Sequence, residues 1–494
     1  MLFKRRKASA GLRLLQVSSE FFPLLKTGGL ADVAGALPAA LQGQGAEPRV
    51  LLPGFPSVWA GFQHERDVAT LVMPWGESVR VVLGRLCGST QAYLIDAPHL
   101  FDRPGNPYEN QHKQPYADNH RRFAVLGWVA AHLARGADAQ WTPQVVHAHD
   151  WHAAWVAPAL AHWPVQGSQQ HVPVVFTVHN LAYQGLFAAD QFGELGLPAS
   201  AFNMHGVEFH GMGSFMKAGL YYADHITTVS PTYAQEIQTA DQGCGLDGLL
   251  RERSGQLSGI LNGVDDSVWN PQTDALIPAT YHPRNMTGKA VCKAALQAEA
   301  GLQANQRAPL LAVVSRLTSQ KGMNLVLDNI DASVAQGAQW VVLGSGDAWL
   351  EDALMSKMHQ HPGQVSVRKG YDEPYAHRIF GGADAIVVPS HYEPCGLTQL
   401  YGLKYGCVPV VRQVGGLADS VVDTTEETLQ QKTATGVVFE HFNVEGLSYA
   451  LRQLIKLYQK EPVWKQVRRQ GMACEFSWDV AASQYVNLYQ RLLA

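Results

Sequence analysis

Short apolar runs alternate with amphipathic stretches along the whole chain. The run from Leu12 to Val17 predicts a buried first strand, and the apolar spacing that begins at Leu30 is that of a helix start. Further strands are expected in the first half at 49–53, 79–86, 93–95, 145–149, 172–178 and 226–229, and helices at 121–135, 151–162, 216–222 and 231–237. Such alternation is typical of a parallel sheet covered by helices on both faces.

The same pattern begins again in the second half. Strands are expected at 257–261, 309–314, 340–343, 365–367, 385–388 and 408–411, with helical patterns between them. Because 494 residues are too many for one core, we predict two doubly wound α/β domains, at 12–257 and 258–475. The final segment, 476–494, is amphipathic and aromatic-rich, so it needs a surface against which to bury.

Composition narrows the class of protein. The chain is 46% hydrophobic and 16% charged, an ordinary globular profile, and its net charge of −4 gives no general attraction for nucleic acid or acidic membranes. Six scattered cysteines without a C-x-x-C pair are typical of free thiols in a reducing compartment. No apolar run approaches the ~18 residues of a membrane span. Residues 1–11 are basic without an apolar core, which predicts a disordered tail rather than a secretory signal. We expect a cytoplasmic protein with no nucleic-acid or membrane partner.

The loop from Lys26 to Leu30 is the first candidate site. A double glycine between a strand and a helix start exposes backbone N–H groups at the positive end of a helix dipole, and Lys26 adds a full charge. The alternative is a simple tight turn beside a solvated lysine. Residues 28–32 recur as residues 415–419, after another apolar run, which favours two related α/β halves.

Two loops of the second half carry further candidate chemistry. Arg316 and Lys321 share a strand-to-helix loop and could neutralise a diphosphate, unless they are merely solvated. No carboxylate cluster suited to a catalytic Mg²⁺ is apparent. Glu393 follows another strand, ahead of N–H groups of Gly396 to Thr398 that would form an anion nest. Its carboxylate could orient sugar hydroxyls or stabilise positive charge at an anomeric carbon. The alternative for Glu393 is a helix N-cap.

The stretch from His147 to His152 permits three interpretations. It resembles the H-x-H-x-D-H metal box of binuclear hydrolases, but its spacing departs from that box, so a sugar contact by Asp150 or buried structural histidines are favoured over a metal. His179 and Asn180 end a strand in uncharged hydrogen-bonding groups suited to sugar hydroxyls. Tyr371 follows a strand and is either a stacking partner for a nucleotide base or a core aromatic.

Taken together, these motifs resemble the bacterial glycogen synthase and plastid starch synthase family over almost the whole chain, from about Leu12 to Leu493. The motifs that carry the resemblance are Lys26-Thr27-Gly28-Gly29-Leu30, Val146-His147-Ala148-His149-Asp150-Trp151-His152, Phe176-Thr177-Val178-His179-Asn180, Asn262-Gly263-Val264-Asp265, Ser315-Arg316-Leu317 with Lys321-Gly322, and Glu393-Pro394-Cys395-Gly396-Leu397-Thr398-Gln399.

The resemblance implies a GT-B fold: two Rossmann-like domains around a deep cleft, with the helix at 476–494 crossing back to the N-terminal domain. It implies transfer of glucose from ADP-glucose to the non-reducing 4-OH of an α-1,4-glucan such as glycogen, with retention of configuration and without a metal or other cofactor. The N-terminal domain would hold the acceptor and the C-terminal domain the donor. Two other functions stay open: a catalytically dead glucan- or nucleotide-binding protein, and a transferase of UDP- or GDP-sugars.

The resemblance also assigns roles. The diphosphate would be held by Lys26, Arg316 and Lys321, which form the catalytic set together with Glu393. The glucose would be surrounded by Asp150, His179, Asn180 and Glu393, and adenine would stack on Tyr371. Tyr108 and Asn262 would face the cleft, and the substrate-binding set would be completed by Gly28, Gly29, Cys395, Gly396, Leu397 and Thr398. Many related retaining transferases hold the ribose with a second glutamate eight residues after the first. Here that position is Tyr401, as in the synthase family, so a carboxylate–ribose contact is not expected.

Overall fold

The structure is a computed structural model that describes residues 11–163 and 171–494. It divides into two compact units. The first contains the described residues up to Val229, together with Ala234–Gly263 and Trp478–Ala494. The second contains Ser230–Tyr233 and Val264–Ser477. The predicted disordered tail lies, apart from Gly11, outside the described residues. No helix within the described ranges is long and apolar enough to cross a membrane.

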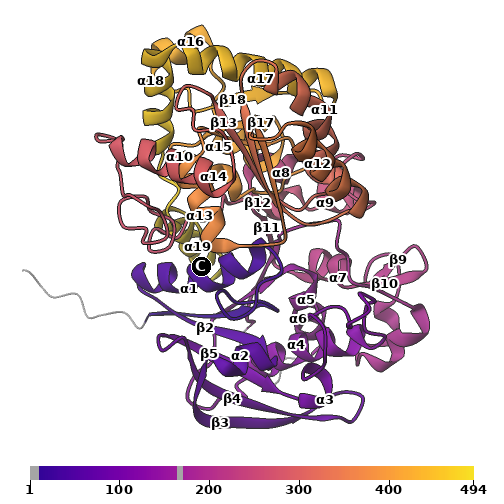
Figure 1. Cartoon of the computed structure of the whole chain (residues 1–494). Helices are drawn as coiled ribbons and strands as arrows, with labels where there is room; N and C mark the ends of the chain where they lie inside the picture. Colours follow the sequence, from indigo (N-terminus) through magenta and orange to yellow (C-terminus); the bar gives the residue numbers. More distant parts are fainter. Residues whose placement is uncertain (1–10, 164–170) are drawn as a thin grey trace, which may run out of the picture. The chain divides into compact units, whose positions relative to one another are not determined.

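One large sheet organises the first unit (Figure 1). Its strands in spatial order are β12 (Leu257–Gly259), β11 (His225–Thr228), β7 (Val174–Val178), β6 (Val145–His149), β1 (Leu12–Val17), β2 (Ala46–Pro53), β5 (Thr90–Asp96), β4 (Ser78–Leu86) and β3 (Phe62–Val72). The strands from β12 to β5 are parallel, and β4 and β3 are antiparallel additions at one edge. Because parallel strands end at the same edge, the residues that follow β1, β6 and β7 come together.

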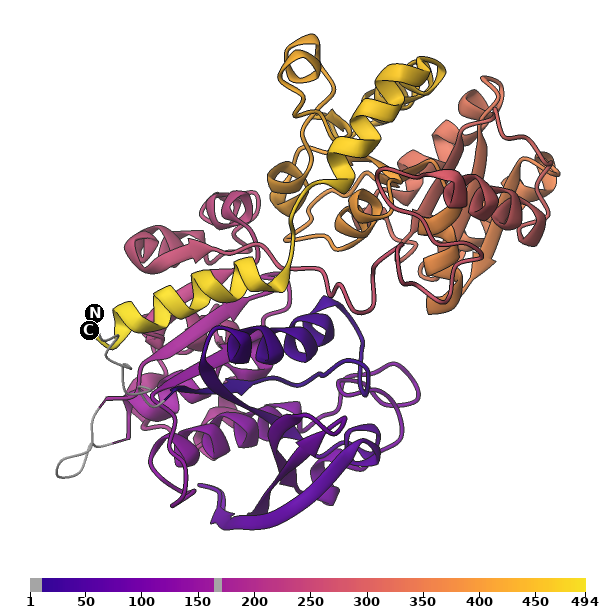
Figure 2. The same ribbon diagram turned by 90° about the vertical axis from the view of Figure 1, so that its left-hand side faces the viewer.

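The helices of this unit cover the sheet. They are α1 (Gly29–Gly43), α2 (Pro56–Ala60), α3 (Pro98–Phe101), α4 (Asn119–Ala134), α5 (Asp150–Ala153), α6 (Val156–Ala161), α7 (Phe215–Tyr222), α9 (Asp247–Glu252) and α19 (Trp478–Leu492), with α8 (Pro231–Glu236) at the boundary of the two units. The last helix, α19, packs beside α1 on this sheet (Figure 2). Tyr485 and Leu488 join a core there with Leu37 and Leu41. A small separate sheet has the order β8 (Leu186–Phe187), β10 (Met212–Ser214), β9 (Glu208–Phe209).

Several short elements of this unit were not predicted, and three further differences concern the large sheet and its helices. Strand β12 pairs with β11, so it closes the first sheet instead of opening the second, and the first unit continues to Gly263 rather than ending at 257. Strand β3 was not predicted because it lies at the edge of the sheet with charged, exposed residues along it. The helix expected at 151–162 is divided into α5 and α6. Pro158 has no N–H to donate to the carbonyl of residue 154, so the series of helical hydrogen bonds is interrupted there.

The second unit is built on a six-stranded parallel sheet. Its order is β15 (Val365–Lys369), β14 (Gln339–Gly344), β13 (Leu310–Val314), β16 (Ala385–Val388), β17 (Val408–Arg412) and β18 (Val437–Phe439), of which β18 was not predicted. Apolar clusters cover both faces under α10 (Thr287–Glu299), α11 (Met323–Val334), α12 (Ala348–Gln360), α13 (Glu373–Gly382), α14 (Thr398–Lys404), α15 (Gly415–Ser420), α16 (Glu426–Gln431), α17 (Val444–Gln459) and α18 (Glu461–Met472). The strand order reverses between β13 and β16, which is where open parallel sheets bind ligands.

Candidate active site

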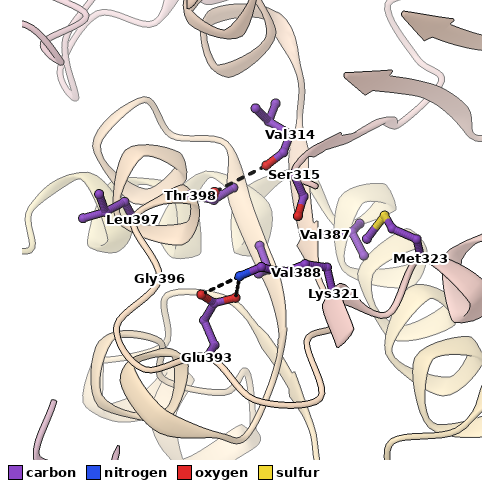
Figure 3. A pocket seen from close by; sticks show the side chains of 10 residues that line it. All are labelled: Val314, Ser315, Lys321, Met323, Val387, Val388, Glu393, Gly396, Leu397 and Thr398. Carbon is purple, nitrogen blue, oxygen red and sulfur yellow. Dashed lines mark hydrogen bonds and ion pairs between the residues drawn. The ribbon is translucent and has the colours of Figure 1, made fainter. Parts of the chain in front are cut away.

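The loops that follow β13 and β16 line a pocket at this reversal point of the second unit (Figure 3). Its lining consists of Val314, Ser315, Lys321, Met323, Val387, Val388, Glu393, Gly396, Leu397 and Thr398. Five of the predicted site residues, from Lys321 to Thr398, are therefore brought together. Of the described residues, the predicted contacts Arg316, Cys395 and Tyr371 are not part of this lining.

Lys321 and Glu393 form an ion pair in the pocket (Figure 3). The ammonium lies 2.8 Å from Oε1 and 2.7 Å from Oε2 of Glu393, and the Ser390 hydroxyl donates to Oε2 at 2.7 Å. The two side chains are only 18% and 10% exposed. The pocket thus holds a carboxylate and a cation in direct contact.

The loops after β13 and β16 also form hydrogen bonds with each other. Gly322 has φ +72°, and a Cβ there would stand 2.2 Å from the carbonyl oxygen of Pro389, so a glycine is needed directly after Lys321. The N–H of His391 donates to the carbonyl of Gln320 at 2.8 Å, and the Gln320 amide donates to the carbonyl of Tyr392 at 2.7 Å. The pair Lys321–Glu393 thus rests on a fixed backbone.

Arg316 lies on the same loop with an exposed side chain, 3.5 Å from Oε1 of Gln320. The loop therefore carries one half-buried and one exposed cation.

The residues after Glu393 lead into α14. Cys395 is buried, and the Gln399 side chain donates to the carbonyls of Cys395 and Gly396 at 2.9 and 2.7 Å. The N-cap position of α14 is Leu397, which excludes the alternative that Glu393 caps this helix.

The second copy of the repeated motif, at residues 415–419, contacts the backbone of Glu393. The N–H of Gly416 donates to the Glu393 carbonyl at 3.1 Å, and a Cβ at Gly415 would stand 2.0 Å from that oxygen.

In the first unit, the loop from Lys26 to Leu30 binds a carboxylate group of the protein itself, that of Glu20. The backbone N–H groups of Thr27 and Gly28 donate to Oε2 of Glu20, at 2.7 and 3.3 Å, and the Thr27 hydroxyl donates to Oε1. Lys26 pairs with Asp32 at 2.8 Å. The backbone of Thr27 and Gly28, directly before α1, thus forms a turn that binds the Glu20 carboxylate. Glu20 was missed, although its position just past the end of β1 was a usable signal.

Tyr108, from the long loop after α3, joins Glu20. Its hydroxyl donates to Oε1 of Glu20 at 2.5 Å and lies 3.0 Å from the Ser19 hydroxyl. Its ring stacks on His152 with centroids 4.6 Å apart. Burial and the Glu20 carboxylate together raise the pKa of Tyr108 well above its usual value, so it stays a neutral donor.

Asp150 occupies a strained and buried position at the end of β6. It has φ +61°, which an aspartate rarely adopts, and Oδ1 has no hydrogen-bond partner among the described residues. Burial raises its pKa to about 8, although backbone N–H groups of His179 and Asn180 act in the opposite direction. A buried acceptor without a partner is uncommon in folded proteins and calls for an explanation.

The histidines around Asp150 make structural contacts. His147 hydrogen-bonds Thr177 through Nε2 at 2.6 Å and the Tyr489 hydroxyl through Nδ1 at 2.7 Å, while His149 Nδ1 lies 3.1 Å from His179 Nε2. Burial lowers the pKa of His147 and of His179 to about 3, so both are neutral. Within the ranges described, no group of three or more His, Cys, Asp or Glu residues is arranged to hold a metal ion.

Comparison with known proteins identifies the family. Residues 13–252 match the model of the starch synthase catalytic domain, and residues 297–470 match that of glycosyl transferases group 1. A glycogen synthase of Variovorax paradoxus (strain S110) is 55% identical over 491 residues, covering 98% of this chain and 99% of the relative. A glycogen synthase of Leptothrix cholodnii is 55% identical over 488 residues, covering 98% and 100%. The chain belongs to the glycogen synthase and starch synthase family.

A solved member of this family has the same fold. The catalytic domain of starch synthase IV from Arabidopsis thaliana, bound to ADP and acarbose, superposes with a TM-score of 0.86 at 31% identity, covering 97% of this chain and 99% of that one. The chain is therefore a GT-B glycosyltransferase with two Rossmann-like domains, as the motifs predict.

Three further positions, Tyr371, Tyr401 and Asn262, differ in their exposure. Tyr371 is 65% exposed after β15, which excludes the alternative that it is a core aromatic, and its hydroxyl donates to Glu373 at 2.7 Å. Tyr401 is buried and stacks on Trp269 at 4.0 Å, so this side chain is part of the core. Asn262, in the first unit, is buried, and its Oδ1 has no partner in the described part of the chain.

Proposed function

We propose that this protein transfers glucose from ADP-glucose to the non-reducing 4-OH of an α-1,4-glucan, with retention of configuration, and so elongates glycogen. The observation that carries the proposal is the Lys321–Glu393 pair at the strand reversal of the second unit, in a chain of this family. In this proposal the second unit binds the donor and the first unit binds the acceptor.

The pair suits a sugar diphosphate. An ammonium group has three N–H donors, and the Glu393 oxygens accept two of them, which leaves one for a phosphate oxygen. Arg316, exposed on the same loop, adds a planar guanidinium group whose N–H donors match the geometry of phosphate oxygens. ADP leaves readily only when its charge is neutralised, so both cations act mainly in the transition state. Glu393 would face the glucose and stabilise positive charge at its anomeric carbon.

The remaining residues keep the roles that the resemblance gives them. Asp150, with its unpartnered oxygen, would accept a hydrogen bond from a sugar hydroxyl beside His179 and Asn180, and exposed Tyr371 would stack on adenine. Lys26, Gly28, Gly29, Tyr108 and Asn262 complete the proposed contacts of the first unit, and Cys395, Gly396, Leu397 and Thr398 those of the second. We propose no metal or cofactor. The six thiols are all free, which supports a cytoplasmic location.

A donor panel tests the proposal. The purified protein is assayed with ADP-, UDP- and GDP-glucose on glycogen, following incorporation of glucose and release of the nucleotide, with and without EDTA. We expect transfer from ADP-glucose that is at least about tenfold more efficient than from the other donors, a difference of about 1.4 kcal/mol, and insensitive to EDTA. Preference for UDP- or GDP-glucose, or binding without transfer, would establish one of the two alternative functions instead.

A further inference from the structure

A hydrogen bond joins His149, a buried residue, to His179, a proposed glucose contact. His149 ends β6 and is fully buried, whereas His179 follows β7 and is partly exposed. His149 pairs with Thr177 across the two parallel strands, and the residue two places further along the chain is His179. The two rings meet there, with Nδ1 of His149 lying 3.1 Å from Nε2 of His179. One ring nitrogen of His179 is thus bonded within the protein, and Nδ1 is the nitrogen that can meet a ligand.

The ring of His149 packs against a fixed neighbour. The ring of His147 lies next to it, with centroids 4.1 Å apart. His147 is itself bonded at both nitrogens, to the Thr177 hydroxyl at 2.6 Å and to the Tyr489 hydroxyl of α19 at 2.7 Å. All four side chains are fully buried. Because close packing holds buried side chains in single rotamers, His149 keeps its Nδ1 directed at His179.

The contact also couples the positions of two protons. Burial lowers the pKa of His179 to about 3 and that of His149 well below its usual value, so both rings are neutral and each carries one N–H. A hydrogen bond between two ring nitrogens needs one nitrogen with a proton and one without. The proton position of one ring therefore determines that of the other.

The surroundings of His149 favour one of the two arrangements. Its Nε2 is buried and has no hydrogen-bond partner among the described residues. A proton on Nε2 would be a buried N–H without an acceptor, and orphaned buried N–H groups are rarer than orphaned acceptors. The proton therefore belongs on Nδ1, which donates to Nε2 of His179. His179 then carries its own proton on Nδ1, where it can donate to a ligand.

We propose that His149 is a positioning residue that fixes both the ring and the proton of His179, so that the Nδ1–H of His179 donates to a hydroxyl oxygen of the transferred glucose. A sugar hydroxyl can accept a hydrogen bond, so a fixed donor matches it. A donor that is oriented before the sugar arrives needs no reorganisation during the reaction. The inference rests on the proposed function, in which His179 contacts the glucose, and adds a residue that acts through His179.

Two substitutions of His149 provide the kinetic test. His149→Phe keeps a ring of similar size without a nitrogen, while the amide of His149→Asn keeps an N–H donor near the position of Nδ1. We expect His149→Phe to lower kcat/KM for ADP-glucose on glycogen at least about tenfold, equal to about 1.4 kcal/mol, and His149→Asn to recover most of that loss. The Kd for ADP, which lacks the sugar, should stay within about threefold of the wild-type value in both variants.

His225→Phe is the matched control. His225 lies on β11 of the same sheet and is hydrogen-bonded through Nε2 to Oγ of Ser258 at 2.9 Å, but it begins its strand, at the end opposite to the carboxyl edge. This variant should leave kcat/KM within about twofold of the wild-type value. In the His179→Ala background, His149→Phe should have almost no further effect on kcat/KM, because a positioning residue acts only through the residue that it positions.

A spectroscopic test locates the proton directly. Nitrogen NMR of the protein labelled in its histidine rings distinguishes an N–H from an unprotonated ring nitrogen, and comparison with His179→Gln identifies the signals of His179. We expect His179 to carry its proton on Nδ1 in the wild-type protein and partly on Nε2 in His149→Phe. A proton on Nε2 of His179 in the wild-type protein would overturn the proposal, whether or not His149→Phe folds.

The other outcomes are separable. Wild-type kcat/KM in a folded His149→Phe variant would overturn the positioning role while leaving glucosyl transfer by the wild-type protein intact. Equal losses of kcat/KM and of ADP binding, without recovery in His149→Asn, would also overturn it, because His149 would then only stabilise the fold. Absence of transfer by the wild-type protein would instead remove the proposed function, and its NMR spectrum would still decide whether His149 fixes the proton of His179.

Discussion

The Lys321 ammonium lies between the two carboxylate oxygens of Glu393, 2.8 Å from Oε1 and 2.7 Å from Oε2. The two opposite charges are in direct contact. A donor phosphate would therefore bind to a lysine that is already oriented by the glutamate. Each residue depends on the other, and substitutions at the two positions should not be additive.

Lys321→Ala should reduce mainly kcat. Losing a desolvated charge contact costs ~2–5 kcal/mol, which corresponds to a ~30- to 4,000-fold slower turnover. Steady-state kinetics with ADP-glucose and glycogen measure the effect. Lys357→Ala is the control, because Lys357 is equally exposed (19%) and is also paired, with Asp331. A folded Lys321→Ala variant with wild-type kcat would remove Lys321 from the catalytic set.

Glu393→Ala should abolish transfer while ADP still binds. The carboxylate would face the glucose, so calorimetric titration with ADP should give a Kd within a few-fold of the wild-type value. Ser390→Ala, which removes only the 2.7 Å bond to Oε2, should retain measurable turnover. If Glu393→Ala no longer binds ADP, Glu393 is a nucleotide ligand or a structural residue.

The strands with strong apolar runs could be predicted from the sequence, and so could the loops that follow them. The pocket residues Lys321 and Glu393 were found because each follows a buried strand, β13 or β16, at the edge where parallel strands end. What the sequence could not reveal was the pairing of strands. The short β12 reads equally well as the end of one sheet or the start of another, and only its register with β11 decides.

Glu20 illustrates a second limit. The double glycine at 28–29 predicts an anion site, but the sequence pattern does not identify which anion the N–H groups of Thr27 and Gly28 bind. In the structure a carboxylate eight residues earlier fills that position. The same holds for Asp150: a motif places it beside a strand, whereas its φ of +61° and its unpartnered oxygen depend on tertiary packing.

Asp150 should make stability fall as pH rises. Burial raises its pKa in the folded protein to about 8, above the value in the unfolded chain, so the folded state binds more protons between about pH 4 and 8. The contribution to the free energy of unfolding is full at low pH and is lost as pH rises through about 8. Asp150→Asn removes this dependence. Its stability relative to wild type should increase by about 3 kcal/mol between pH 6 and pH 9.

Chemical unfolding of both proteins at pH 6 and pH 9 measures this difference. Asp190→Asn, at an exposed position of the same unit, is the control and should show no such trend. A difference between Asp150→Asn and wild type that is equal at the two pH values would show that Asp150 titrates normally.

Arg122 should position Tyr108. This buried guanidinium donates to the carbonyls of Leu100 and Pro107, at 2.8 and 2.9 Å, and to the side chain of Asn119, which in turn donates to the Tyr108 carbonyl at 2.9 Å. Arg122→Met leaves these acceptors unsatisfied, at ~1–3 kcal/mol each. We expect a lower unfolding midpoint and a fall in kcat/KM of at least about tenfold. Arg122→Lys should recover part of both losses.

A double-mutant comparison separates positioning from stability alone. If Arg122 acts through Tyr108, then Tyr108→Phe should reduce kcat/KM less in the Arg122→Met background than in the wild-type protein. Arg121→Met, at the neighbouring and only partly buried position that pairs with Glu194, should be nearly neutral. Fully additive losses would show that Arg122 only stabilises the fold.

Tyr489 should anchor the last helix to the first sheet. Its hydroxyl lies 2.7 Å from Nδ1 of His147, whose Nε2 lies 2.6 Å from the Thr177 hydroxyl, and Tyr489 and His147 are fully buried. Burial lowers the pKa of His147 to about 3, so the ring is neutral and Nδ1 can accept a hydrogen bond from the tyrosine hydroxyl.

Tyr489→Phe leaves this nitrogen unsatisfied, which costs ~1–3 kcal/mol. The midpoint of thermal unfolding should fall by about 2–4 °C for each kcal/mol, while Tyr449→Phe, at an exposed position, should leave it unchanged. Equal midpoints for Tyr489→Phe and wild type would show that α19 is held by apolar contacts alone, because the cluster of Tyr485 and Leu488 with α1 would then account for its attachment.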